Sequence, residues 1–64
     1  MKIGKNLKQL REEKGLTLYK VCKDTNTSYP TLWQIENDKK TIGLELLVRL
    51  AKYYNVSLDW LCNM

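Results

Sequence analysis

The segment from Thr17 to Asn37, TLYKVCKDTNTSYPTLWQIEN, constrains the fold more than any other part of the 64-residue chain. Its centre, Thr25-Asn26-Thr27, predicts a tight turn with Asn26 at a positive φ, because Asn is the best substitute for glycine there. Ser28 is expected to cap a second helix, and Pro30 falls in its first turn, where a missing N–H costs little. The segment therefore predicts two short helices, at about 17–24 and 28–37, joined by a turn.

The predicted helix 28–37 combines an apolar face with an opposite face that carries no charge. At roughly 100° per residue, Leu32 and Ile35 fall together on the side expected to face the core. The opposite face is made of aromatic and amide-bearing residues with one proline: Tyr29, Pro30, Trp33, Gln34 and Asn37. A helix that turns such a face to water predicts a surface that binds a partner.

Helical spacing also dominates the first part of the chain. Ile3, Leu7 and Leu10 lie at i, i+4 and i+7, and Gly15 is suited to the left-handed conformation that closes a helix. Thr17 is expected to cap the following helix, which carries Val21 and Cys22 inward.

The second half of the chain predicts two more helices. The apolar set expected to face the core in 43–54 is Leu44, Leu47, Val48 and Ala51. Asn55 suits the end of this helix, and Ser57 is expected to start a last helix with Leu58 and Leu61 inward. The fold class expected is therefore all-α: one domain over residues 1–64, with helices at about 3–14, 17–24, 28–37, 43–54 and 57–62.

Charge and composition limit the classes of function that the chain can have. Seven of the eleven basic residues lie in residues 1–23, against two of the seven acidic ones. This basic half suits a polyanion such as nucleic acid or an anionic membrane surface, and the alternative is that the lysines only solvate a helix face. No apolar run approaches the roughly 20 residues of a membrane span, and no secretory signal is present.

Residue types argue against catalysis and metal binding. The chain has no histidine, and Cys22 and Cys62 lie 40 positions apart, so a zinc site has too few ligands. Without histidine, a phosphate loop or a carboxylate pair in an evident cleft, we expect no enzyme, no cofactor and no small-molecule ligand. Two unpaired thiols suit a reducing cytoplasm.

Four stretches in this order carry a resemblance over the whole chain: IGKNLKQLREEKGLT, SYPTLWQIEN, LELLVRLAKYYNVS and SLDWL. The chain resembles the lambda-repressor-like, Cro-type helix-turn-helix proteins of bacteria and their phages, often called the XRE family, without gaps from Ile3 to Leu61. The resemblance implies a compact five-helix domain and a sequence-specific regulator of transcription, expected to be a repressor, that binds double-stranded DNA. Helix 28–37 would lie in the major groove. The alternative is a protein–protein interaction module that uses the exposed Tyr29 and Trp33.

The resemblance also implies roles for individual residues. The expected base contacts are Tyr29, Pro30, Trp33, Gln34 and Asn37. The expected phosphate contacts are Ser28, Thr31, Lys20, Lys39 and Lys40. Arg11 and Glu36 match a structural ion pair between the first and third helices, and the alternative is two solvated charges. Gln34 suits adenine and the two aromatic rings suit thymine methyl groups, so we expect readout that favours A·T pairs.

A homodimer on a two-fold-related operator is expected, with half-sites about 10 bp apart. The candidate dimer interface is Trp60, Met64, Leu46 and Leu50, and the alternative is that these residues complete the core of one monomer. The sequence departs from the family pattern at several positions. Leu18 replaces a common backbone-binding glutamine, Thr25 a core leucine and Asn26 a glycine, and Pro30 removes a side chain that would read a base.

Overall fold

A computed structural model of the chain describes residues 3–63. Its helices in this range are α1 (Ile3–Glu13), α2 (Leu18–Thr25), α3 (Tyr29–Glu36), α4 (Leu44–Tyr54) and α5 (Leu58–Asn63). The predicted all-α class is confirmed, since no described residue lies in a strand. Each observed helix end lies within one residue of the range expected from the sequence. None of these helices has the length and apolar character needed to cross a membrane.

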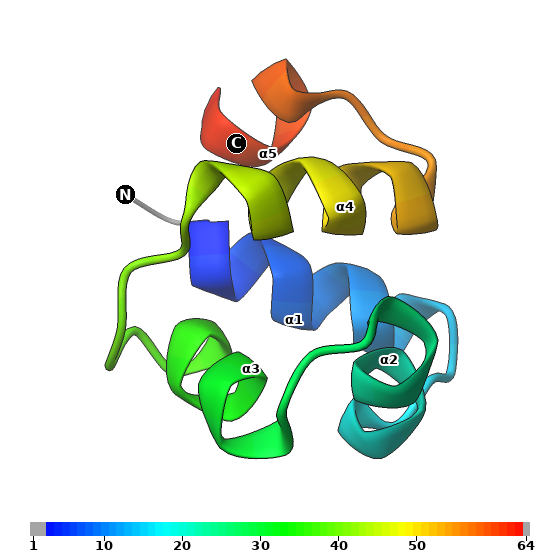
Figure 1. Cartoon of the computed structure of the whole chain (residues 1–64). Coiled ribbons are helices and arrows are strands. Elements are labelled where there is room, and N and C mark those ends of the chain that lie inside the picture. Colours follow the sequence, from blue (N-terminus) through cyan, green and yellow to red (C-terminus); the bar gives the residue numbers. More distant parts are fainter. Residues whose placement is uncertain (1–2, 64) are drawn as a thin grey trace.

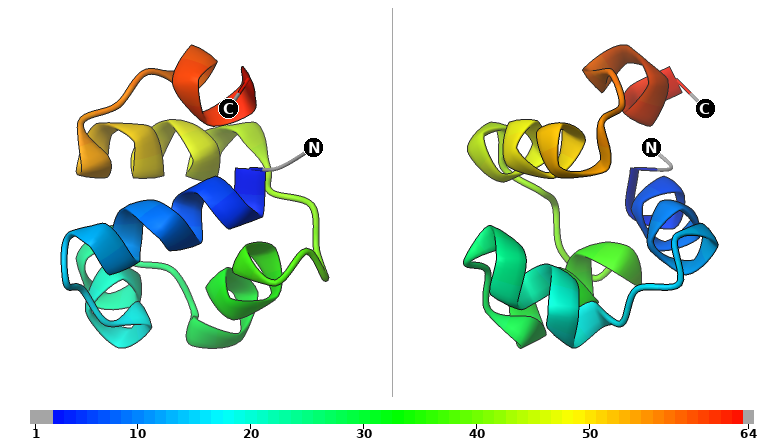
Figure 2. Two further views of the ribbon diagram at one scale, coloured as in Figure 1. Left: turned by 180° about the vertical axis from the view of Figure 1, so that it is seen from behind. Right: turned by 90° about the vertical axis from the view of Figure 1, so that its right-hand side faces the viewer.

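The helices are arranged so that α2 and α3 lie together at one end of the molecule (Figure 1). The views in Figure 2 agree that α5 lies at the opposite end, with α1 and α4 between. Polar contacts join these layers. The buried Asn6 of α1 donates to the Leu61 carbonyl at 2.9 Å. Arg49 of α4 donates to the Thr25 carbonyl, at 3.0 Å, where α2 ends.

Every helix contributes one side chain that is fully buried. These residues are Leu7, Val21, Leu32, Leu50 and Leu61. Burying a side chain of this size contributes about 1.5–3 kcal/mol, so a core of one such residue from each helix holds all five together.

The buried face of α4 differs from the expected one. Leu44 is 71% exposed, whereas Leu50 is completely buried and Tyr54 nearly so. The observed buried set is Leu47, Leu50, Ala51 and Tyr54. This set has the same spacing as the expected one but lies three residues later in the chain. It is the buried set because α4 packs against α2 and α5. Leu58 of α5, expected to face inward, is also partly exposed.

Left-handed residues close four of the helices. Gly15, Asn26 and Asn55 have φ values of 67°, 55° and 57°, in accord with their expected places at helix ends. Asp38, at φ 58°, closes α3 and was expected only to lie in a polar loop. At each site the N–H of the residue that follows reaches back to a carbonyl near the helix end, as from Lys39 to Gln34 at 2.7 Å.

Gly4 sets the distance between α1 and α3. It is buried, and a Cβ atom built on it would overlap the carbonyl oxygen of Ile35 and come within 3.0 Å of Asp38 Oδ1. The carbonyl belongs to the backbone of α3, so it cannot move aside as a side chain does. Only glycine permits this approach.

We therefore expect Gly4→Ala to destabilise the protein by about 1–3 kcal/mol, as overpacking does. Helix propensity alone would favour alanine by about 1 kcal/mol, so a net loss identifies the contact with Ile35. Chemical unfolding followed by circular dichroism measures the change. Gly43→Ser is the control, because a Cβ there meets no atom within 4 Å and its φ of −77° suits any residue. Equal stability of the Gly4→Ala variant and the parent chain would contradict the prediction.

Candidate nucleic-acid interface

The turn between α2 and α3 is built by local side chains. Thr17 caps α2, as expected, by accepting the N–H of Lys20 at 3.1 Å. Ser28 lies at the N-cap of α3 but makes no capping hydrogen bond, contrary to expectation. Its hydroxyl instead donates to Thr31 Oγ1 at 2.6 Å. Thr25, which replaces a family leucine, is buried and satisfies its hydroxyl by donating to the Val21 carbonyl at 2.7 Å.

The outward face of α3 contains all five expected base-contacting residues. Tyr29, Pro30, Trp33, Gln34 and Asn37 are all exposed. The two aromatic rings are each close to half exposed. Asn37 folds back on its own helix, because its Nδ2 donates to the Trp33 carbonyl at 2.8 Å. Leu32, Ile35 and Glu36 face the interior, so the surface of α3 carries no charged side chain.

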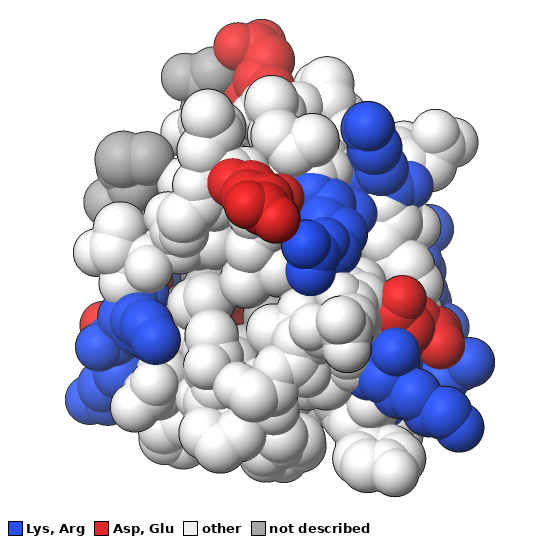
Figure 3. Space-filling model, in the orientation of Figure 1, with Lys and Arg blue, Asp and Glu red and all other residues white. Residues whose placement is uncertain are grey.

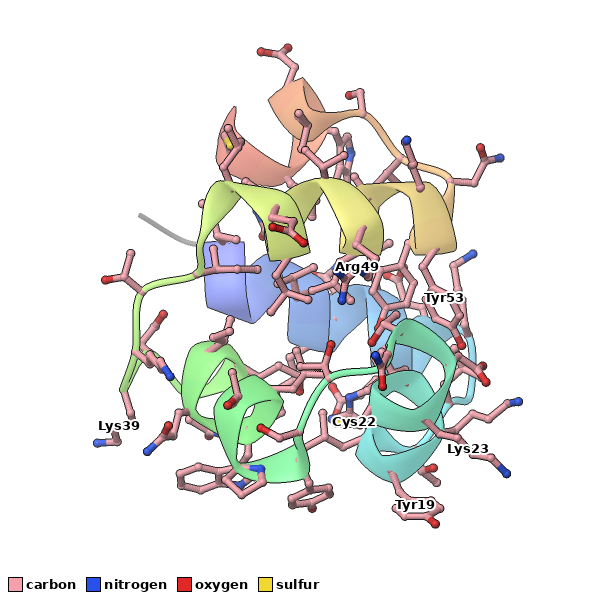
Figure 4. All side chains as sticks on the ribbon, in the orientation of Figure 1. Tyr19, Cys22, Lys23, Lys39, Arg49 and Tyr53 are labelled. Atoms are coloured by element: carbon pink, nitrogen blue, oxygen red, sulfur yellow. The ribbon has the colours of Figure 1, made fainter. Side chains whose placement is uncertain are left out.

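Lysines lie on both sides of this uncharged face. The space-filling view shows basic groups to either side of α3, with no charge over the helix itself (Figure 3). Figure 4 places Lys39 on one side and Lys23 on the other. Lys40 is exposed beside Lys39, and among the described residues neither has an ion-pair partner. Thr31, the remaining expected phosphate contact, is half-buried.

Lys20, another expected phosphate contact, is partly neutralised within the protein. Its Nζ lies 3.1 Å from Asp24 Oδ1, and the Tyr53 hydroxyl donates to the other oxygen of Asp24 at 2.6 Å. The hydrogen bond from Tyr53, followed by that from Lys20, holds the pKa of Asp24 below its ordinary value. An aspartate is ionised at neutral pH even at its ordinary pKa, and the lowered pKa of Asp24 extends its pairing with Lys20 to more acidic pH.

The expected ion pair between Arg11 and Glu36 is present and buried. Arg11 Nε donates to both carboxylate oxygens of Glu36, at 3.1 and 3.2 Å, and the two side chains are only 14% and 2% exposed. Burial alone lowers the pKa of Arg11, but the hydrogen bond and charge of Glu36 outweigh burial and raise it. Arg11 also donates to the Leu16 carbonyl at 3.0 Å. The pair therefore joins α1, the turn after it and α3. The alternative, that Arg11 and Glu36 are two separate solvated charges, is wrong.

A shallow groove of about 550 Å³ separates α2 from the start of α3. Its lining includes Tyr19, Lys23 and Tyr29. Tyr19 was not among the expected site residues, yet it is 69% exposed. Leu18, beside it, is buried. Its side chain therefore cannot replace the glutamine that binds the DNA backbone in many members of the family that the sequence resembles. The outward position of residue 19 follows from the helical period of Leu18, Val21 and Cys22, which could have identified it.

The two cysteines are unpaired. Cys22 is buried and Cys62 exposed, and burial raises the pKa of the Cys22 thiol. Within residues 3–63, no group of three or more cysteine, aspartate or glutamate side chains is placed to hold a metal ion.

The residues of the candidate dimer interface differ in how far they are exposed. Leu50 is completely buried among residues of its own chain, so its assignment to a dimer surface is wrong. Leu46 and Trp60 are half-buried and pack against the core, which leaves part of each side chain accessible. Met64 lies outside the described residues.

Comparison with known proteins gives a family match. The model of the family described as helix-turn-helix matches residues 7–61. The chain is also 33% identical over 61 residues to the HTH-type transcriptional regulator ImmR of Bacillus subtilis (strain 168). That similarity covers 95% of this chain and 48% of the regulator, so the chain spans about half of the regulator's length. No solved structure gives a significant match.

We expect Glu36→Gln to destabilise the protein by about 3–5 kcal/mol, because it leaves the charge of Arg11 buried without its partner. The same change at Glu45 is the matched control. Glu45 pairs with Arg49 at 3.2 Å on an exposed surface, so Glu45→Gln should change stability by less than about 0.5 kcal/mol. The double variant Arg11→Met/Glu36→Leu should recover most of the loss. Urea unfolding measures all three, and similar losses for the two Gln variants would contradict the structural role of the pair.

Proposed function

Because the chain belongs to the helix-turn-helix family, we propose that it is the DNA-binding part of a transcription regulator and that α3 reads the major groove. The observation that carries the proposal is the uncharged amide and aromatic face of α3 between two groups of lysines. A helix fits the major groove, where uncharged side chains reach base edges and flanking lysines reach phosphates. The proposed role requires neither a cofactor nor a catalytic residue.

Base readout is proposed to depend chiefly on Gln34. A free amide can bind adenine N6 and N7 together, but the Asn37 amide already donates to the Trp33 carbonyl. Asn37 therefore has less freedom to pair with a base. Tyr29 and Trp33 are proposed to pack on thymine methyl groups, and Pro30 to contact the same groove without a hydrogen bond. Because α3 carries no Arg or Lys, the commonest contact to guanine is missing from it.

The phosphate contacts are proposed to lie on both sides of α3. Lys39 and Lys40 follow the Asp38 turn and extend from the end of α3, where the backbone of one strand would pass. At the start of the helix, Ser28 donates to Thr31, which leaves the Thr31 hydroxyl hydrogen available for a phosphate oxygen. Lys20 is proposed as a weaker contact because Asp24 already holds its charge.

We further propose that residues 3–63 act as one domain and that two copies bind a two-fold-related operator. Two recognition helices enter successive major grooves when the half-sites are about 10 bp apart. The exposed parts of Leu46 and Trp60 are proposed to contribute to the surface between the copies. Occupation of an operator excludes other proteins from it, and we propose repression by this route.

Selection of bound sequences from a randomised duplex pool tests the function. The expected result is enrichment of a two-fold-symmetric sequence with A·T-rich half-sites about 10 bp apart and affinity that falls steeply with salt. Enrichment of an asymmetric site would overturn the dimer. No enrichment and no salt dependence would overturn DNA binding, and the Tyr29 and Trp33 face would then fit a protein partner.

Base and phosphate contacts should respond differently to alanine substitution. Gln34→Ala should relax preference at one base position and weaken binding to the selected duplex by about 1–3 kcal/mol. Lys39→Ala should weaken binding to all sequences and reduce the slope of log affinity against log salt by about 0.9. Lys52→Ala, at an exposed lysine on α4, is the control for loss of charge. Titration by fluorescence anisotropy separates these effects, and the reverse pattern would show that the two assignments are exchanged.

A further inference from the structure

We propose that Tyr19 of α2 is a further DNA-contacting residue, which donates its hydroxyl hydrogen to a backbone phosphate beside the groove that α3 occupies. The proposal rests on the DNA-binding function proposed above. It extends the interface from α3 to the preceding helix. It also assigns a role to an exposed side chain outside the set that the sequence predicts to contact DNA.

The first observation is that the Tyr19 side chain makes no hydrogen bond or ion pair within residues 3–63. It is 69% exposed, and its hydroxyl has no hydrogen-bond partner among the described residues. The two tyrosines of α4 differ from it, because Tyr53 donates to Asp24 at 2.6 Å and Tyr54 is buried, whereas Tyr29 of α3 is exposed like Tyr19. A single exposed ring is ordinary on a protein surface, so the position of Tyr19 must carry the argument.

That position is on the side of the molecule that presents α3. Tyr19 and Tyr29 line the same groove between α2 and α3, together with Lys23 and Ser28. Figure 4 shows Tyr19 directed away from the core at the end of the molecule formed by these two helices. A duplex that received α3 in its major groove would therefore bring a strand of its backbone past this part of α2.

The neighbouring residues of α2 leave few other donors for that strand. Leu18 is buried, and the Lys20 ammonium is held by Asp24 at 3.1 Å. Lys23 is exposed and has no partner among residues 3–63, but it lies one helical turn beyond Tyr19. Within the first turn of α2, which begins at Leu18, Tyr19 is thus the exposed side chain with an uncommitted hydrogen-bond donor.

The chemistry of a phenol hydroxyl suits this task. Tyrosine is among the side chains that donate to phosphate oxygens, and such contacts position a protein on DNA without reading sequence. A neutral donor displaces no counterion, so its loss should weaken binding without changing the salt dependence. A lysine in the same place would displace one counterion and steepen that dependence.

The test measures affinity for the selected duplex and for an unrelated duplex, each over a range of salt concentrations, with the 64-residue chain. Tyr19→Phe removes only the hydroxyl and should weaken binding to both duplexes about three- to tenfold, with an unchanged salt slope. Tyr19→Lys should steepen the slope by about 0.9. Tyr54→Phe, which removes the hydroxyl from a buried ring of α4, is the matched control and should change affinity less than about twofold.

Both Tyr19 results are required. If the parent chain binds DNA but either variant fails its expectation, Tyr19 lies off the phosphate backbone, and a contact with a partner protein becomes the better explanation of its exposure. Weakening confined to the selected duplex would overturn the phosphate assignment in favour of a base contact. If the parent chain binds neither duplex, the proposed function fails, and this inference fails with it.

Discussion

The ion pair between Arg11 and Glu36 determines which face of α3 is available for binding. Glu36 is the charged side chain of the segment YPTLWQIE, and the pair turns it inward until it is 2% exposed. Arg11 holds both carboxylate oxygens and also the Leu16 carbonyl after α1. A buried ion pair is weak evidence for stability, because desolvation offsets much of the attraction. It does set orientation here, since rotating α3 would leave one of the two charges buried alone.

Backbone geometry completes the placement of α3. The absence of a side chain at Gly4 allows α1 to approach the Ile35 carbonyl, and Asp38 then turns the chain with φ at 58°. Without that turn α3 would continue in the same direction. With it, the next residues, Lys39 and Lys40, leave the helix at one side of the outward face of α3. The contact at Gly4 and the turn at Asp38 therefore together place α3 and the two lysines that follow it.

In the proposed function, the resulting surface separates two tasks of DNA recognition. Its uncharged centre offers an amide and two aromatic rings, which respond to base edges, while lysines at its border respond to phosphates of any sequence. Hydrogen bonds and ion pairs within the chain already occupy some of the polar side chains on this surface. The Asn37 amide donates to the Trp33 carbonyl and Lys20 pairs with Asp24. Among residues 3–63, the groups left without such a partner are the Gln34 amide at the centre and Lys23, Lys39 and Lys40 at the border. In the proposed complex with DNA, specificity and salt-dependent affinity would therefore rest on different residues.

The sequence by itself determined the features that depend on local residue types and on the helical period. These are the all-α class, the turn at Asn26, the Thr17 cap and the outward residues of α3. It could not choose the buried face of α4, because two sets three residues apart have the same spacing; only packing against α2 and α5 placed Leu50 inside and Leu44 outside. Burial of the pair between Arg11 and Glu36 and the close approach at Gly4 were likewise decided by tertiary structure. The reason is that both depend on atoms from segments far apart in the chain, which meet only when the helices pack.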